Sequence, residues 1–244
     1  MSSTSHIPIP ICMYHKVQGD IEHSRSWVTV ETFRKQMALF KDYGYQTISF
    51  DQFLAFRSSP IQAKFFILTL DDGYESVYTE VFPILKEFGF TATLFLVTSL
   101  ISEVERKDNS WDVACESYWK VNHLLWPEVI EMQKAGFEIG SHGVTHRPLQ
   151  HLPPVVIKHE LSYSKAFLES KLGIPIKVYS YPYGGGSENQ TIKNLIRNAG
   201  YEAALGSGGN PTEYLDTPDL FNLKRKTMVE SVNEHNFGGY VENT

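Results

Sequence analysis

Short apolar runs alternate with helical patterns along almost the whole chain, and this alternation limits the folds open to it. The clearest run is Lys64 to Leu70 (KFFILTL), whose nearly continuous apolar character is typical of a strand buried on both faces of a parallel sheet. Helical patterns separate further strand-like runs at residues 9–13, 46–48, 91–97, 137–140, 176–181, 201–205 and 223–229. The alternation predicts a parallel α/β sheet, either open or closed into a barrel.

The chain of 244 residues contains no segment that resembles an interdomain linker, so we expect one domain spanning residues 1–244. Residues 102–125 interrupt the alternation, because they are polar, rich in aromatic residues and without clear periodicity. We interpret this stretch as an insertion over one face of the domain. Aromatic side chains suit sugar rings, but they more often form a local core; those in the insertion are Trp111, Tyr118 and Trp119.

Composition disfavours several classes of function. The formal net charge of −6 opposes binding to nucleic acid, which requires Lys and Arg to neutralise phosphates, and it opposes docking on an anionic membrane. The two cysteines, Cys12 and Cys115, form no disulfide or metal-binding pattern. The first residues do not resemble a signal peptide, and no window reaches the roughly 18 apolar residues of a membrane-spanning helix. We therefore expect a soluble, cytoplasmic protein.

Two pairs of polar residues follow predicted strands, where the functional groups of parallel α/β folds gather. Asp71 and Asp72 come directly after the KFFILTL run, although Asp-Asp-Gly is also ordinary turn chemistry. His142 and His146 follow another predicted strand, and two histidines four residues apart can converge on one metal ion. One Asp and two His would form a three-ligand set that leaves room for water and substrate, as in catalytic zinc sites.

A third motif, YPYG, ends a further predicted strand and is either a Pro/Gly turn or a groove wall whose backbone N–H faces an oxyanion. Together the motifs resemble the polysaccharide deacetylase family, also called carbohydrate esterase family 4 or the NodB homology domain. The matching pieces are TLDDG at Thr69–Gly73, SHGVTH at Ser141–His146, YPYG at Tyr181–Gly184 and WPEVIEMQKAGFEIGSH at Trp126–His142. The opening CMYHKV and the ending NLKRKTMV resemble a short form of the family, and the similarity covers about residues 9–230.

The resemblance implies a single-domain distorted (β/α) barrel with roughly seven or eight mostly parallel strands. By matched position, it also implies that Asp72, His142 and His146 ligate one divalent metal ion and that Asp71 is the general base. Zinc is the expected ion, and this ligand set also suits cobalt, nickel, manganese or iron. The backbone N–H of Tyr183 would help to hold the tetrahedral oxyanion.

The substrate-binding residues are also placed by the resemblance. It implies that Tyr181 and Tyr183 line the sugar groove, and we place Pro182 of the same motif in the substrate site. Trp126 lies close to the motifs and is predicted to shape the pocket. The alternative is that Trp126 acts as a hydrophobic staple at the start of the following helix.

The sequence departs from the family pattern in two places that concern proton transfer. The family usually carries an Arg two residues before the Pro of its third motif, thought to orient the catalytic Asp, and Ser180 stands there instead. Arg225 is a candidate substitute, but our preferred interpretation is a surface charge. The family often also ends in Leu-x-His, whose His is the general acid, and no such motif occurs near the C-terminus. We predict His15 as this acid; the alternative is a buried His packed beneath the site.

We therefore expect a metal-dependent hydrolase that removes N-acetyl groups from amino sugars in a polysaccharide, an oligosaccharide or a sugar conjugate. Two alternatives stay open. One is an O-acetyl esterase or small-amide hydrolase on the same fold, and the other is a catalytically inactive glycan-binding module. The expected partner is an acetylated amino sugar, with no nucleic acid and no membrane insertion, and the sequence does not specify the oligomeric state.

Overall fold

A computed structural model describes residues 9–19, 26–56, 63–107, 121–208 and 219–242 of the chain. Its strands are β1 (Ile11–Tyr14), β2 (Val17–Gln18), β3 (Val28–Thr29), β4 (Gln46–Thr47), β5 (Phe65–Leu70), β6 (Thr93–Leu96), β7 (Glu138–Ser141), β8 (Val178–Ser180), β9 (Ala203–Leu205) and β10 (Lys226–Thr227). Only the ends of the expected insertion are described. Its residues Trp111, Cys115, Tyr118 and Trp119 lie outside the described residues.

The main sheet has the strand order β10-β1-β5-β6-β7-β8-β9, with β4 pairing additionally to β5, and every pairing in it is parallel. The sheet curls, because the segment 223–226 joins its two ends. Leu223 forms a parallel bridge with Leu205, the last residue of β9, and Lys226 pairs with Cys12 of β1. The predicted distorted (β/α) barrel is therefore confirmed. β2 and β3 form a separate small sheet.

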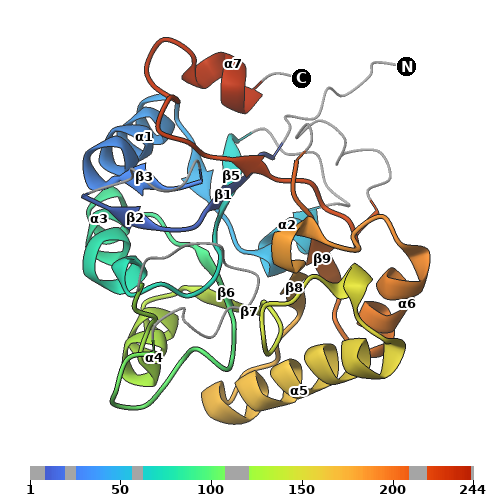
Figure 1. Cartoon of the computed structure of the whole chain (residues 1–244). Helices are drawn as coiled ribbons and strands as arrows, with labels where there is room; N and C mark the ends of the chain where they lie inside the picture. Colours follow the sequence, from blue (N-terminus) through green and yellow to red (C-terminus); the bar gives the residue numbers. More distant parts are fainter. Residues whose placement is uncertain (1–8, 20–25, 57–62, 108–120, 209–218, 243–244) are drawn as a thin grey trace, which may run out of the picture.

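The helices surround the strands (Figure 1). They are α1 (Val30–Asp42), α2 (Phe50–Phe56), the π-helical η1 (Val77–Val81) that continues into α3 (Phe82–Phe88), α4 (Trp126–Lys134), η3 (Leu149–His151), α5 (Pro154–Leu172), η4 (Pro182–Gly184), α6 (Gln190–Asn198) and α7 (Phe237–Glu242). The helical spacing of Phe33, Met37 and Phe40 predicts the buried face of α1 correctly. Within the described parts of the chain, no helix combines the length and apolar character needed to cross a membrane.

The alternation of side chains along β5 decides which residues face the inside of the barrel. Phe66, Leu68 and Leu70 belong to the larger core, which the outer helices share. Ile67 points the other way, into a second core that contains residues from β1, β6, β8 and β9 together with Phe50 and Phe53 of α2. Continuing this alternation places the next odd-numbered residues, Thr69 and Asp71, on the interior side at the end of β5.

Candidate active site

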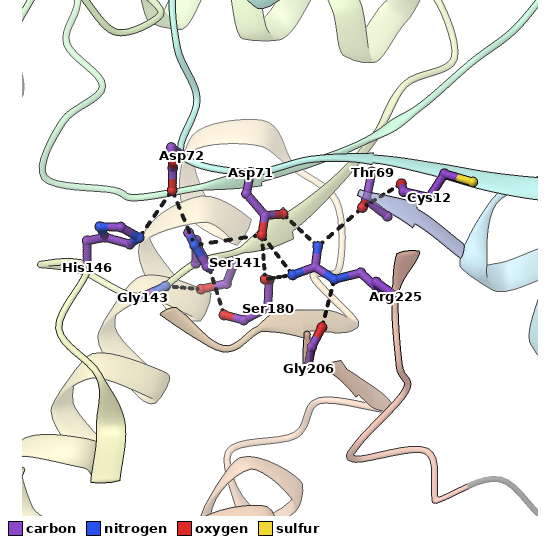
Figure 2. Close-up of polar contacts among 11 residues, drawn as sticks. Cys12, Thr69, Asp71, Asp72, Ser141, Gly143, His146, Ser180, Gly206 and Arg225 are labelled. Carbon is purple, nitrogen blue, oxygen red and sulfur yellow. Dashed lines mark hydrogen bonds and ion pairs between the residues drawn. The ribbon is translucent and has the colours of Figure 1, made fainter. Parts of the chain in front are cut away.

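The polar motifs meet at the carboxyl ends of the parallel strands, as the sequence predicts (Figure 2). Asp71 and Asp72 directly follow β5, and His142 directly follows β7. Ser180 is the last residue of β8. Because the strands run parallel in one curled sheet, these ends lie at the same edge, and residues far apart in the sequence come within hydrogen-bonding distance.

The side chains of Asp72, His142 and His146 converge on one point, and each of them is buried. Oδ1 of Asp72 lies 3.3 Å from Nε2 of His142 and 3.1 Å from Nε2 of His146. In a tetrahedral zinc site with bonds of about 2.0–2.2 Å, ligand atoms lie roughly 3.3–3.6 Å apart. Both distances from Oδ1 of Asp72 are therefore close to those that a small divalent ion requires, within a few tenths of an ångström.

The second ring nitrogen of His142 supports this assignment. Nδ1 of His142 lies 2.8 Å from the backbone oxygen of Ser180, and a carbonyl oxygen can only accept a hydrogen bond. Nδ1 therefore carries the proton, which leaves the lone pair of Nε2 directed at Asp72 and available to a metal ion. This arrangement of a ligating His with an outer hydrogen-bond acceptor is usual in metal sites.

Unusual backbone conformations occur in all three motifs. Among the residues that the structure describes, the non-glycine residues with positive φ are Asp72 at 74°, His146 at 57° and Tyr183 at 57°. Each such conformation costs on the order of 1–3 kcal/mol and persists only where the surroundings enforce it. Two of the three are presumptive metal ligands, so the local strain coincides with the site.

Asp71 is paired with Arg225, which is only 2% exposed, so the interpretation of Arg225 as a surface charge is wrong. The guanidinium group donates from Nη1 to Oδ1 of Asp71 and from Nη2 to Oδ2, both at 2.8 Å. Nη2 also donates to the hydroxyl of Ser180 at 2.9 Å, and that hydroxyl donates to Oδ2 of Asp71 at 3.1 Å. Nε of Arg225 donates to the backbone oxygen of Gly206, which fixes the plane of the group. The structure thus supports the alternative that Arg225 takes the place of the Arg that the family usually carries at position 180, because it bonds to both carboxylate oxygens of Asp71.

The charges around the two aspartates keep both ionised. Burial alone would raise the pKa of Asp71, but the adjacent charge of Arg225 outweighs it and holds the pKa below the ordinary value. Burial likewise opposes ionisation of Asp72, yet His146 and His142 hold its pKa well below the usual range. The low pKa of each carboxylate therefore has its own cause: Arg225 beside Asp71, and the two imidazoles beside Asp72.

His15 lies close enough to Asp71 and Asp72 for their charges to affect its pKa. Burial lowers the pKa of His15, while the charges of Asp72 and Asp71 act in the opposite direction. The residue as a whole is partly exposed, but its Nδ1 atom is buried and has no hydrogen-bond partner among the described residues. An imidazole beside the two carboxylates, with one nitrogen unpaired, is compatible with a proton donor. The role of His15 as the general acid stays a prediction.

Two of the expected substrate-binding side chains are in the core instead. Tyr181 is 1% exposed and its hydroxyl donates to the backbone oxygen of Phe221, so its ring cannot line a groove. Trp126 is also buried, and its ring packs edge-on against Phe167 of α5, so it is a core residue; this contact is not the staple alternative, because Trp126 is the first residue of α4 and Phe167 lies in another helix. Apolar side chains at these positions contribute more free energy by burial than by exposure at a rim.

The remaining two residues of that set belong to the short helix η4 beside the metal ligands. Pro182 is buried. Tyr183 is 52% exposed, and its ring centroid lies 4.6 Å from that of His146. Tyr183 is therefore the one expected groove residue with an accessible aromatic face next to the ligands.

Glu160 of α5 is a buried carboxylate beside the His142–His146 motif, and the sequence interpretation overlooked it. It lies on the buried face of the helix with Ile157, Leu161 and Ser164. That spacing is a usable signal, because a carboxylate on an apolar helix face needs buried partners.

Comparisons with known proteins agree with this geometry. The family model described as "Polysaccharide deacetylase" matches residues 58–204, which is more than half of the chain. The chain is 25% identical to YxkH of Bacillus subtilis (strain 168) over 96% of this chain and 76% of that protein. It is 31% identical to the poly-beta-1,6-N-acetyl-D-glucosamine N-deacetylase of Escherichia coli (strain K12), over 84% of this chain but only 35% of that enzyme.

Solved structures share the fold at lower sequence identity. The Streptococcus pyogenes deacetylase PplD, solved in complex with acetate, has a TM-score of 0.80 and 22% identity, covering 98% of this chain and 100% of that one. BC0361, a polysaccharide deacetylase from Bacillus cereus, has a TM-score of 0.78 and 21% identity, covering 96% of this chain and 69% of that one. From the family match, the relatives and the shared fold, we conclude that this chain belongs to the polysaccharide deacetylase family.

Proposed function

We propose that this chain is a divalent-metal-dependent hydrolase that removes N-acetyl groups from amino sugars in a polysaccharide, an oligosaccharide or a sugar conjugate. One observation carries the proposal: three buried ligand atoms converge beside a carboxylate, Asp71, that Arg225 holds ionised. Metal-assisted hydrolysis of an amide uses a Lewis acid and a base, and the three candidate ligands and Asp71 would supply them. The name of the E. coli relative, an N-deacetylase, supports the choice of N-acetyl over O-acetyl groups in this proposal.

The residues divide the chemistry among them. Asp72, His142 and His146 would hold the divalent ion, with zinc as the expected ion, and such an ion would supply Lewis-acid polarisation and a more acidic water. Asp71 lies beside the candidate ligands, with its Oδ2 3.9 Å from Nε2 of His142. From this position it would accept a proton from the attacking water. The backbone N–H of Tyr183 donates to the developing oxyanion, and its exposed ring packs on the sugar.

His15 completes this scheme as the donor of a proton to the leaving amine. Replacing His15 by Gln is expected to slow release of acetate from N-acetylglucosamine oligomers by about 10²–10⁴-fold, because an amine leaves only when protonated. The same variant should hydrolyse 4-nitrophenyl acetate at the parent rate, because a nitrophenolate needs no proton to leave. Comparing the two substrates tests the role. An equal fall for both would assign His15 to the shape of the site instead.

The proposed activity is tested by acetate release from metal-depleted and reconstituted protein. Removing divalent ions with a chelator is expected to abolish release from N-acetylglucosamine oligomers, and adding zinc should restore it, because three protein ligands leave positions open for water and substrate. Cobalt, nickel, manganese and iron should be compared in parallel, because this ligand set accepts each of them.

Two outcomes would contradict the proposal in different ways. If metal binds but only O-acetylated sugars or small amides lose acetyl groups, the site stands and the substrate class is wrong. If the protein takes up no divalent ion and binds glycan without turnover, the glycan-binding alternative replaces the hydrolase.

A further inference from the structure

A single carboxylate organises the loop that carries His146. Glu160 is 1% exposed and projects from the middle of α5. Its Oε2 accepts hydrogen bonds from the backbone N–H groups of Val144 at 2.7 Å and Thr145 at 3.0 Å. Its Oε1 accepts the hydroxyl of Thr145 at 2.5 Å and lies 3.5 Å from Nη2 of Arg147. Bonds to an ionised acceptor are stronger than bonds between neutral groups, so this carboxylate binds the loop firmly.

Three further backbone groups of the loop are also engaged. The N–H of Gly143 donates to the hydroxyl of Ser141, and the backbone oxygens of Gly143 and Val144 accept from the N–H groups of Thr98 and Ser99. Gly143 has a φ of +83°, and a Cβ there would lie 3.0 Å from Oε2 of Glu160. The loop and the carboxylate therefore fit each other closely, between the strand ends on one side and α5 on the other.

The consequence concerns His146, which directly follows the residues that Glu160 holds. His146 has the left-handed backbone conformation described above, which a free loop would rarely adopt. The carboxylate of Glu160 bonds to residues 144, 145 and 147 and not to the three ligand side chains, so it acts through the backbone of residues 144 and 145. Its own backbone oxygen accepts from Ser164, whose hydroxyl also accepts from Ser141, so α5 is joined to the end of β7 as well.

We propose that Glu160 is a positioning residue for the metal site: its buried carboxylate holds the Gly143–Arg147 loop so that Nε2 of His146 is aimed before a metal ion arrives. This inference rests on the proposed function, since it assigns a role toward the metal that the function requires. A ligand that is already in place loses little freedom on binding, so the effect of Glu160 lies in metal affinity. Residues outside the ligand set that orient ligands commonly influence affinity in this way.

The test measures zinc affinity of the full chain by competition with a chromogenic chelator. Replacing Glu160 by Gln removes the charge and half of the acceptor capacity, and is expected to weaken zinc binding by about 10–100-fold. Replacing Thr145 by Val removes the bond from its hydroxyl to Glu160 and the bond that this hydroxyl accepts from Nε of Arg147, but it keeps both backbone bonds to the carboxylate, so it should weaken binding by a smaller factor. This second variant keeps the test decisive if Glu160→Gln does not fold.

Glu138 offers a matched control. It is a partly buried carboxylate, which accepts from the N–H of Phe50 and the hydroxyl of Thr93, but it lies at the opposite end of β7. Glu138→Gln is expected to retain the parent zinc affinity, even where thermal unfolding of the metal-free protein shows lower stability. Parent-like zinc affinity in Glu160→Gln, or in Thr145→Val if Glu160→Gln does not fold, would overturn the inference, and so would an equal loss in Glu138→Gln.

The same experiment separates this inference from the proposed function. If zinc affinity depends on Glu160 but no acetylated sugar is hydrolysed by the parent protein, the positioning role stands and the deacetylase proposal fails. If the parent protein binds no divalent ion, both fail together.

Discussion

Replacing Asp71 by Asn is expected to reduce deacetylation by about 10²–10⁴-fold while the protein still binds zinc, because the substitution removes the general base and leaves the ligands in place. Asn has nearly the same shape as Asp but cannot accept a proton from water at neutral pH. The ligand set of Asp72, His142 and His146 does not include Asp71, so zinc affinity should stay close to that of the parent. Acetate release under saturating zinc, measured beside chelator competition, gives both quantities.

Asp72 provides the matched control, because it is the adjacent residue and the same type of side chain. Asp72→Asn is expected to lose zinc affinity as well as activity, since Oδ1 of Asp72 faces both imidazoles. The two variants should therefore separate base from ligand. If Asp71→Asn keeps most of the parent rate, or if it loses zinc as Asp72→Asn does, the assignment of the two aspartates is wrong.

Replacing Arg225 by Met is expected to destabilise the protein by about 3–5 kcal/mol, because it leaves the buried charge of Asp71 without its partner. The free energy of unfolding of the metal-free protein, measured by chemical denaturation, tests this. Arg34 is the control: it forms an exposed pair with Glu87 at 2.6 Å, and Arg34→Met should have a far smaller effect because water screens the pair. Equal losses for the two variants would show that the Arg225 contact has no special energetic role.

The pH dependence of the Arg225 variant follows from the same pair. The folded pKa of Asp71 lies below its ordinary value, so its ionised form stabilises the fold above the unfolded pKa, and this contribution is lost as the pH falls through the folded pKa. Removing Arg225 raises the folded pKa, so Asp71 takes up a proton at a higher pH. The acidic limb of kcat/KM should therefore move to higher pH. An unshifted acidic limb would mean that Arg225 does not set the ionisation of the base.

Local sequence patterns predicted the elements of this fold well, because buried parallel strands and amphipathic helices each have their own periodicity. These patterns predict the strand from Phe65 to Leu70 and the candidate metal ligands at its end and after β7. Strand ends were less accurate, since the run at 223–229 contains only the two-residue strand β10. A short pattern of apolar residues does not reveal where backbone pairing stops.

Long-range pairing explains what the sequence could not predict. Arg225 and Asp71 are separated by 154 positions, and nothing near Arg225 in the sequence indicates a buried partner. The YPYG motif contains two tyrosines, of which Tyr181 is buried and Tyr183 is exposed. The turn in η4, where Tyr183 has a positive φ, decides which of the two faces solvent. These assignments depend on which strands become neighbours, and local patterns do not contain that information.

The segment that closes the barrel has a consequence for the order in which the site matures during synthesis. Ribosomes make Asp71, Asp72 and both histidines well before residues 223–227, which join β9 to β1 and carry Arg225. If the chain folds in the order of its synthesis, the candidate ligands Asp72, His142 and His146 would come together before Arg225 pairs with Asp71. The proposed metal site would then form before the ion pair that lowers the pKa of Asp71.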